Sequence, residues 1–298
     1  MPASPSTPTH VLDIDDLSAA DVTELLTLAA RIKSGDQAPR LAATLAMLFE
    51  QPSTRTRVSF EAGIEQLGGT AVFLGPDETQ LDRGEPIRDT ARALSQYVDL
   101  IAARVADHDE LVTLARYASV PVINALTDAA HPCQTLADLL TIREIHGDDT
   151  QIAWVGDGNN VCQSLTLGAA LTGFDLTIAT PAGYAIDDGV ADRAATLGAR
   201  PAETTDPAAA VADADVVYTD VWTSMAHKTD PAEKRHAFEG FQVTRELLGD
   251  RTLLHCLPAH RGEEVTDAAL ESGMSAVWQQ AQNRLHAQNA LLVWLGAD

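Results

Sequence analysis

The chain has 298 residues, of which 45% are hydrophobic, and it is long enough for about two compact α/β domains. No apolar run approaches the roughly 20 residues that span a bilayer, and residues 1–10 have neither a basic start nor an apolar segment, so we expect neither a membrane protein nor an export signal. A formal net charge of -23 argues against nucleic acid and anionic membranes as partners, because binding to them needs a basic surface.

After this N-terminal tail, short apolar stretches rich in β-branched residues alternate with longer amphipathic stretches at helical spacing. The first half of the chain is predicted to form strands over residues 45–49, 70–74, 100–103 and 120–125, and helices over residues 57–67, 87–96 and 110–117. This alternation is typical of βαβ units, so we expect a parallel sheet with helices on both faces.

A polar stretch, residues 147–150, follows a predicted helix over about 134–146 and indicates a domain boundary. Further strands are predicted over residues 151–155, 175–179, 215–218 and 252–255, and a last helix over residues 279–295. We therefore predict an α/β fold with two doubly wound parallel-sheet domains, residues 1–146 and 147–278, and a C-terminal helix, residues 279–298, that packs back on the first domain. Open α/β sheets bind ligands at the carboxyl ends of their strands, so we expect a cleft between the two domains.

Residues 50–57 follow the first predicted strand and open a helix. A helix N-terminus directs free backbone N–H groups and the positive end of the helix dipole at one point, which favours an anion. The hydroxyls of Ser53, Thr54 and Thr56 add donors, and Arg55 can bind phosphate oxygens through two parallel hydrogen bonds. The alternative is that Ser53 only caps a helix.

The string Pro-Ser-Thr-Arg-Thr-Arg-x-Ser-Phe-Glu, residues 52–61, resembles the carbamoyl phosphate signature of the aspartate and ornithine carbamoyltransferase family. Other motifs keep the order of that family: His-Pro-Cys-Gln at 131–134, Asp-Val-Trp-Thr-Ser-Met at 220–225 and His-Cys-Leu-Pro at 255–258. The Ser-Met motif is similar to the loop that distinguishes ornithine carbamoyltransferases. The resemblance implies transfer of a carbamoyl group from carbamoyl phosphate to L-ornithine, giving L-citrulline and phosphate, without a cofactor or metal. Both directions of arginine metabolism use one site, so the direction, anabolic or catabolic, stays open.

The resemblance also implies which residues bind carbamoyl phosphate: Ser53, Thr54, Arg55, Thr56, Gln80, Arg104, His131, Gln134, Cys256, Leu257 and Arg284. Donors from Arg104, His131 and Gln134 would face the carbonyl oxygen, which becomes an oxyanion when the carbon is attacked. Gln80 matches a family loop that reaches the phosphate of a neighbouring subunit, which implies a homo-oligomer, a trimer or an assembly of trimers. Taken singly, His131 would more often be a helix cap and Arg104 a surface ion-pair partner.

For ornithine, the resemblance implies that Asn160 and the backbone near Met225 bind the carboxylate, and that Asp220 and Ser224 bind the α-amino group. Cys256 would lie beside the δ-amino group. An alkylammonium group has a pKa of about 10.4 and is no nucleophile until it loses a proton, so Cys256 and Asp220 would orient the neutral amine. The implied catalytic residues are Cys256, Arg104, His131 and Asp220. A buried structural cysteine is the alternative for Cys256, and a metal site with His255 and His260 matches no zinc spacing.

Three other functions fit part of the sequence. The turn at 155–158 suggests a dinucleotide oxidoreductase, but Val161 stands at the third glycine position of Gly-x-Gly-x-x-Gly. Putrescine carbamoyltransferase also uses an amine, although the Ser-Met loop argues against it, and a non-catalytic carbamoyl phosphate-binding protein would share the fold. The departures from the family pattern are Ala226 in place of a glycine, and Gln280 and Gln282 in place of acidic residues.

Cysteine and lysine content bear on the compartment. Three scattered cysteines, Cys133, Cys162 and Cys256, do not indicate a disulfide framework and favour a reducing cytoplasm. Only three residues are lysines, and the acidic chain would repel carbamoyl phosphate at low salt. We hypothesise a high-salt, halophilic cytoplasm, because the Debye length falls to about 3 Å at molar salt. An acidic protein from an ordinary cytoplasm is the alternative.

Overall fold

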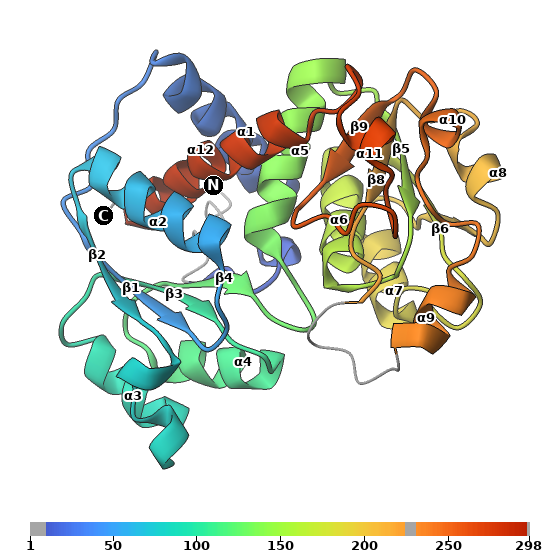
Figure 1. The fold of residues 1–298 in the computed structure, drawn as a ribbon. Helices are drawn as coiled ribbons and strands as arrows, with labels where there is room; N and C mark the ends of the chain where they lie inside the picture. The colour runs from blue at the N-terminus through green and yellow to red at the C-terminus, as the bar shows by residue number, and fades with distance from the viewer. Residues whose placement is uncertain (1–9, 224–230, 297–298) are drawn as a thin grey trace. The chain divides into compact units, whose positions relative to one another are not determined.

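The computed structural model describes residues 10–223 and 231–296. The chain divides into two compact units: unit 1 is Met1–Leu136 with Arg284–Asp298, and unit 2 is Ala137–Asn283. Each unit has one parallel sheet with helices on both faces (Figure 1), which confirms the predicted α/β fold class. Within the described part of the chain, no helix combines the length and apolar character needed to cross a membrane.

Unit 1 contains a four-stranded parallel sheet with strand order β2-β1-β3-β4. The strands are β1 (Thr44–Phe49), β2 (Thr70–Leu74), β3 (Leu100–Arg104) and β4 (Val122–Leu126). The prediction for β2 coincides with the structure, and those for β1 and β3 differ by one residue at one end. The strand predicted over 120–125 begins instead at Val122, after Pro121, whose nitrogen cannot donate to a sheet.

The helices of unit 1 cover both faces of this sheet. They are α1 (Ala19–Ser34), α2 (Thr54–Leu67), α3 (Ile87–Leu94), α4 (His108–Tyr117) and the 3-10 turns η1 (Ile14–Asp16), η2 (Pro76–Glu78) and η3 (Leu81–Arg83). Figure 1 shows α3 and α4 on one face of the sheet and α2 on the other. Helix α1 was not among the predicted elements, although Ser18 and Asp21 form a capping box at its start.

Side-chain alternation along the strands divides the unit 1 core between the two faces. On the face covered by α3 and α4, Leu48 and Ile101 of the sheet pack with Ala91, Leu111 and Leu114 of the helices. The other strand positions point to the opposite face and are also buried, so β1 reads as a nearly continuous apolar run. Strands of parallel sheets are buried on both faces, so a continuous apolar run such as β1 correctly indicates a parallel sheet.

Unit 2 contains a five-stranded parallel sheet with strand order β7-β6-β5-β8-β9. The strands are β5 (Gln151–Val155), β6 (Asp175–Ala179), β7 (Ala202–Thr204), β8 (Val216–Thr219) and β9 (Thr252–His255). The predictions for β5, β6 and β9 coincide with the structure, and β8 is shifted by one residue. The edge strand β7 was not predicted, because three largely exposed residues carry no apolar pattern.

Helices also lie on both faces of the unit 2 sheet, with α6 and α7 on the face opposite α8, α10 and α11 (Figure 1). The helices are α6 (Asn160–Thr172), α7 (Asp188–Leu197), α8 (Pro207–Val211), α9 (Pro231–Ala237), α10 (Arg245–Leu248) and α11 (Asp267–Leu270). The core on the second face joins Val155, Val217 and Leu253 of the sheet to Leu248 and Leu270 of the helices.

Two longer helices, α5 (Pro132–His146) and α12 (Val277–Gly296), each contribute residues to both units. The last part of α12 belongs to unit 1, where the Asn289 side-chain amide donates to Gln66 of α2 at 3.5 Å. Gly63 of α2 has no side chain, which allows this close approach of the two helices. Any side chain at this position would collide with Asn289. The predicted return of the C-terminal helix to the first domain is confirmed.

Candidate active site

Most of the residues predicted to bind carbamoyl phosphate lie in unit 1, several of them where strands β1 and β3 end, whereas Cys256 and Leu257 lie in unit 2. Helix α2 follows β1, and Arg104 is the last residue of β3 and pairs with Phe49 in the sheet register. We call the following set the anion half-site: Ser53, Thr54, Arg55, Thr56, Arg104, His131, Gln134 and Arg284.

The N-terminus of α2 is capped by the sequence motif itself. Ser53 has an extended backbone, with φ -152° and ψ 104°, and its hydroxyl accepts a hydrogen bond from the Thr56 N–H at 3.3 Å. The first turn of α2 carries no acidic residue, so no carboxylate of the helix itself neutralises its positive end. Ser53 is therefore a helix cap. The positive end of α2 that it caps also favours the binding of an anion.

Arg284 joins parts of the half-site that are far apart in the sequence. Its guanidinium donates to the Gln134 side-chain oxygen at 2.6 Å and to the Thr56 hydroxyl at 2.9 Å. All three side chains are at least 95% buried. The contact explains how a single arginine on α12, whose short motif carried little information, becomes part of the site.

His131 is a neutral member of this cationic group. Burial lowers the pKa of its imidazole well below 6.5, and the positive charges of Arg284 and Arg104 lower it further. An imidazole that stays neutral can hydrogen-bond a carbonyl oxygen without adding a charge to the site.

Gln80 does not join the residues above. Its side chain is exposed at the start of η3, and its amide oxygen accepts a hydrogen bond from Arg83 at 3.1 Å. The structure therefore brings Arg104, Arg284 and His131 together with the start of α2, and leaves Gln80 on the surface of unit 1.

The residues predicted to bind an amine lie in unit 2, after three adjacent strands. Strands β5, β8 and β9 are neighbours and parallel, so their carboxyl ends share one edge of the sheet. The register pairs Thr219 with His255, which places the next residues, Asp220 and Cys256, side by side. We call Asn159, Asn160, Asp220, Cys256 and Leu257 the amine half-site.

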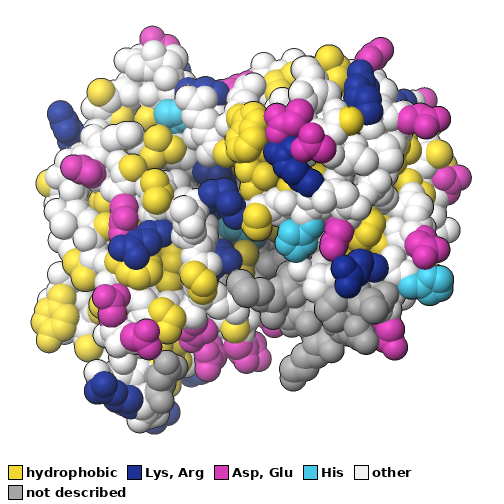
Figure 2. Space-filling model, viewed as in Figure 1, with side chains coloured by type: hydrophobic (Ala, Val, Ile, Leu, Met, Phe, Trp, Pro, Cys, Tyr) yellow, Lys and Arg dark blue, Asp and Glu magenta, His cyan; other side chains and the backbone are white. Residues whose placement is uncertain are grey.

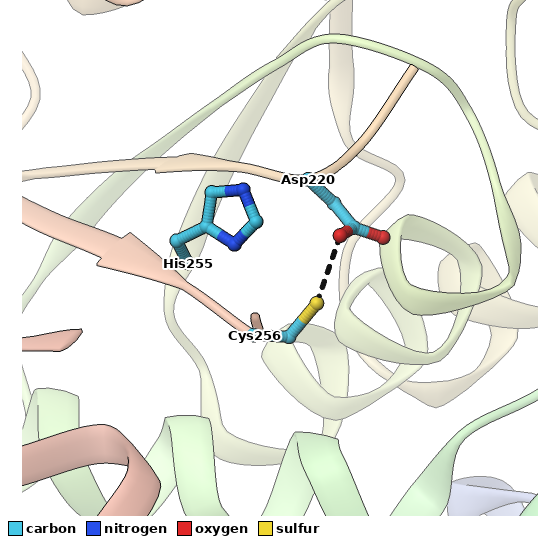
Figure 3. A group of neighbouring side chains, drawn as sticks. All are labelled: Asp220, His255 and Cys256. Carbon is cyan, nitrogen blue, oxygen red and sulfur yellow. Dashed lines mark hydrogen bonds between the residues drawn. The ribbon is translucent and has the colours of Figure 1, made fainter. Parts of the chain in front are cut away.

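Asp220 is the centre of the amine half-site and is 5% exposed. The Cys256 thiol donates to one carboxylate oxygen of Asp220 at 2.9 Å, as the dashed line in Figure 3 shows. The Asn159 side-chain amide donates to the other oxygen at 2.8 Å. Asn160, the first residue of α6, is half-buried, and its side-chain oxygen lies 3.1 Å from the Val161 N–H.

His255 and Glu264 support the segment around Cys256, a role that the sequence motifs did not indicate for either residue. The Leu257 N–H donates to Nδ1 of His255 at 2.9 Å, so this nitrogen carries no proton, and Nε2 donates to Glu264 at 3.1 Å. Both side chains are completely buried. Leu257 has φ 60°, a left-handed conformation that is unusual for a branched residue and is held by this hydrogen bond.

A buried ion pair fixes the turn at 156–160. The Lys234 ammonium on α9 lies 2.6 Å from the Asp157 carboxylate, and these side chains are 1% and 8% exposed. A side chain at Gly158 would come within 2.7 Å of the backbone of residues 184–186, so only glycine fits there. The sequence motif marked this turn, but the lysine lies 77 residues away and could not be assigned to it.

Two of the predicted ornithine-binding residues, Ser224 and Met225, lie outside the described residues, as does Ala226. Two groups of described side chains are close enough for a metal: Asp220 with His255 and Cys256, and His260 with Glu263 and Glu264. In the first group both ring nitrogens of His255 already form hydrogen bonds. His255 would therefore have to give up one of these hydrogen bonds before it could bind a metal.

The other two cysteines are fully buried. Burial raises the pKa of Cys133 to about 12 and raises the pKa of Cys162 well above its ordinary value. The Cys133 thiol donates to the Asn124 carbonyl oxygen at 3.3 Å. Cys256 alone among the three is partly exposed.

Comparison with protein families gives a match for nearly the whole chain. Residues 9–144 match the carbamoyl-P binding domain of aspartate/ornithine carbamoyltransferase, and residues 148–295 match its Asp/Orn binding domain.

Individual relatives agree with this match. The chain is 56% identical to an ornithine carbamoyltransferase of Haloquadratum walsbyi over 96% of this chain and 97% of that protein. It is 50% identical to one of Archaeoglobus fulgidus, with the same shares of the two chains. Among solved structures, the ornithine carbamoyltransferase of Pyrococcus furiosus has a TM-score of 0.92 at 46% identity, covering 99% of this chain and 100% of that one. The enzyme of Thermus thermophilus has a TM-score of 0.89 at 42% identity, covering 97% and 99%.

Proposed function

Because the chain belongs to the aspartate/ornithine carbamoyltransferase family, we propose that it transfers the carbamoyl group of carbamoyl phosphate to the δ-amino group of L-ornithine. The products are L-citrulline and phosphate. The assignment fits relatives of this name that match over nearly their full length.

One observation carries the choice of an amine substrate. The centre of the unit 2 half-site is a buried carboxylate, Asp220, whose hydrogen-bond partners in the described part of the chain are a thiol and an amide rather than a cation. The buried Lys234 is paired with Asp157 instead. A buried, hydrogen-bonded carboxylate favours an ammonium group, whereas the second carboxylate of aspartate would need cations.

Carbamoyl phosphate binds to the anion half-site in this proposal. The start of α2, with Ser53, Thr54, Arg55 and Thr56, binds the phosphate through backbone N–H groups and side-chain donors. The carbonyl oxygen accepts hydrogen bonds from Arg104, His131 and Gln134. Arg284 orients Thr56 and Gln134 through the bonds described above, and the segment Cys256-Leu257 completes the binding residues.

The reaction follows from these groups. The δ-ammonium of ornithine loses its first proton to solvent, and Cys256 with Asp220 holds the neutral amine. The amine nitrogen attacks the carbonyl carbon, and the resulting oxyanion is stabilised by Arg104 and the neutral His131. The C–O bond to phosphate then breaks, and the departing phosphate accepts the proton released by the amine. No covalent enzyme intermediate forms.

The remaining assignments belong to the same proposal. Asn160 and the backbone at Met225 bind the ornithine carboxylate, and Asp220 and Ser224 bind the α-amino group. Residues 1–146 with helix 279–298 form the carbamoyl phosphate-binding domain, and residues 147–278 form the ornithine-binding domain. The enzyme is a cytoplasmic homotrimer, or an assembly of trimers, in which Gln80 reaches the phosphate of a neighbouring subunit.

Adaptation to high salt is also proposed. Asp and Glu side chains are spread over the visible face in Figure 2 rather than gathered in one patch, as expected for a surface that stays hydrated at molar salt. We expect dialysis to low salt to abolish activity. Full activity and stability at low salt would contradict this part of the proposal.

The test of function is citrulline formation from carbamoyl phosphate at molar and at low salt. L-Ornithine, putrescine and L-aspartate are offered in parallel, and released phosphate is measured in each assay. Turnover with ornithine alone is the expected result. Turnover with putrescine or aspartate but not ornithine would overturn the substrate assignment, and carbamoyl phosphate binding without carbamoylation of any amine would identify a binding protein.

A further inference from the structure

We propose that Asn159 is a positioning residue of the reaction, because its side-chain amide orients the Asp220 carboxylate toward Cys256 while leaving the charge of Asp220 available to the amine. This role rests on the proposed function. The sequence motif pointed to the neighbouring Asn160, and Asn159 was assigned no role.

The orientation of the Asn159 amide is fixed by the backbone. Asn159 is the N-cap of α6, and its side-chain oxygen accepts hydrogen bonds from the Val161 N–H at 3.0 Å and the Cys162 N–H at 3.1 Å. Because only the oxygen can accept these bonds, the nitrogen must point the other way. It points to Asp220, which lies 61 residues further along the chain, and donates to it at 2.8 Å.

The Asn159 contact fixes the orientation of the Asp220 carboxylate. Asn159 binds one carboxylate oxygen, and Cys256 donates to the other at 2.9 Å. Asn159 and Asp220 are each only 5% exposed, so water contributes little to holding this carboxylate. Without the Asn159 amide, the Asp220 side chain would lose a hydrogen bond and would no longer be fixed in one rotamer.

The same turn shows why a neutral donor matters. Asp157, two residues before Asn159, is paired with the Lys234 ammonium, which neutralises its charge. Within residues 10–223 and 231–296, Asp220 is held instead by the neutral donors of Asn159 and Cys256, and no described lysine or arginine pairs with it. A charged donor at position 159 would compete with the substrate ammonium, whereas asparagine orients the carboxylate without doing so.

Two variants separate positioning from helix capping. Asn159→Ser and Asn159→Asp both keep a side-chain oxygen that caps α6, and asparagine, aspartate and serine cap helices about equally well. Serine has no amide to reach Asp220, and aspartate places a second carboxylate against it. We expect each variant to lower kcat/KM for ornithine by about 10- to 100-fold, the loss typical of a hydrogen bond to a charged group. The KM for carbamoyl phosphate should stay unchanged.

The matched control is Asp206→Ser at the N-cap of α8, where the side chain also accepts from two backbone N–H groups, those of Ala208 and Ala209. This variant should change melting temperature slightly and kinetics not at all. If both Asn159 variants, folded by circular dichroism, turn over ornithine like the wild type, Asn159 is only a cap and the inference is wrong. If the wild type itself carbamoylates no ornithine, the proposed function fails instead.

Discussion

The anion half-site of unit 1 and the amine half-site of unit 2 occupy the same place in two parallel sheets, yet they carry opposite charge. Both follow the carboxyl ends of adjacent strands. The first gathers arginines, a helix N-terminus and a histidine that burial keeps neutral, whereas the second is centred on one buried carboxylate. The sheet thus supplies the location, and the residues that follow each strand select the ligand by charge.

The two half-sites also differ in how their residues are held. In unit 1 a cation, Arg284, joins the neutral side chains of Thr56 and Gln134. In unit 2 a carboxylate is held by the neutral donors of Asn159 and Cys256. In both half-sites, neutral side chains thus hydrogen-bond a charged group and fix its orientation.

The largest effect is expected from Asp220→Asn, which removes the charge of the amine half-site with little change in shape. We expect kcat/KM for ornithine to fall by about 10³-fold, within the range for loss of one partner of a buried charge pair, because the neutral amide does not attract an ammonium group. Steady-state kinetics with each substrate varied in turn provide the measurement, and Asp187→Asn, at an exposed helix cap, is the control. An equal loss of affinity for carbamoyl phosphate would contradict the assignment of the two substrates to separate half-sites.

Lys234→Met tests whether the buried pair of unit 2 is needed to keep Asp157 neutralised. Removal of one partner should destabilise the protein by about 3 to 5 kcal/mol, because a buried carboxylate is left uncompensated. The double variant Lys234→Met with Asp157→Asn should recover most of that loss in urea unfolding. Arg200→Met, which breaks a surface pair with Asp192, should cost less than about 1 kcal/mol. No recovery in the double variant would show that the lysine stem, packed near Tyr184 and Phe238, matters more than its charge.

Arg284→Lys tests the planar guanidinium of unit 1. A lysine keeps the charge but cannot donate to Thr56 and Gln134 in the same geometry, so the dissociation constant of carbamoyl phosphate should rise by about 10- to 100-fold. Calorimetric titration measures this binding. Arg92→Lys, an exposed arginine paired with Asp89, serves as the control and should bind as the wild type does. Unchanged affinity in Arg284→Lys would mean that charge alone suffices in the anion half-site.

The smallest effect concerns the pH dependence of stability from His131. Its folded-state pKa is lowered below 6.5, so below that pH the unfolded chain binds a proton that the folded chain does not. The contribution to stability is fully present above pH 6.5 and is lost as the pH falls, by at most about 1.4 kcal/mol per pH unit. Urea unfolding of the wild type and His131→Gln between pH 5 and about 7.5 should show a shallower pH slope in the variant. Equal slopes would place the histidine outside the buried cationic group.

Much of the fold followed from local patterns. The strands β2, β5, β6 and β9 were predicted with their observed ends, because buried parallel strands are short apolar runs bounded by polar turns. Helix α1 and strand β7 were missed: the caps of α1 were not used, and β7 is too short and exposed to leave a pattern. The start of α2 was predicted three residues late, since Ser53 caps it at Thr54.

Residue types and their order along the chain were sufficient to indicate the fold class, the anion-binding helix start and the family, because each depends on periodicity or on a contiguous motif. The tertiary structure decided which partners meet: Cys256 with Asp220, Asn159 with Asp220, and Lys234 with Asp157. These pairs are 36, 61 and 77 residues apart. The first two contacts depend on the order β5-β8-β9 and on the register that aligns Thr219 with His255, and the third depends on where α9 packs. No local pattern contains that information.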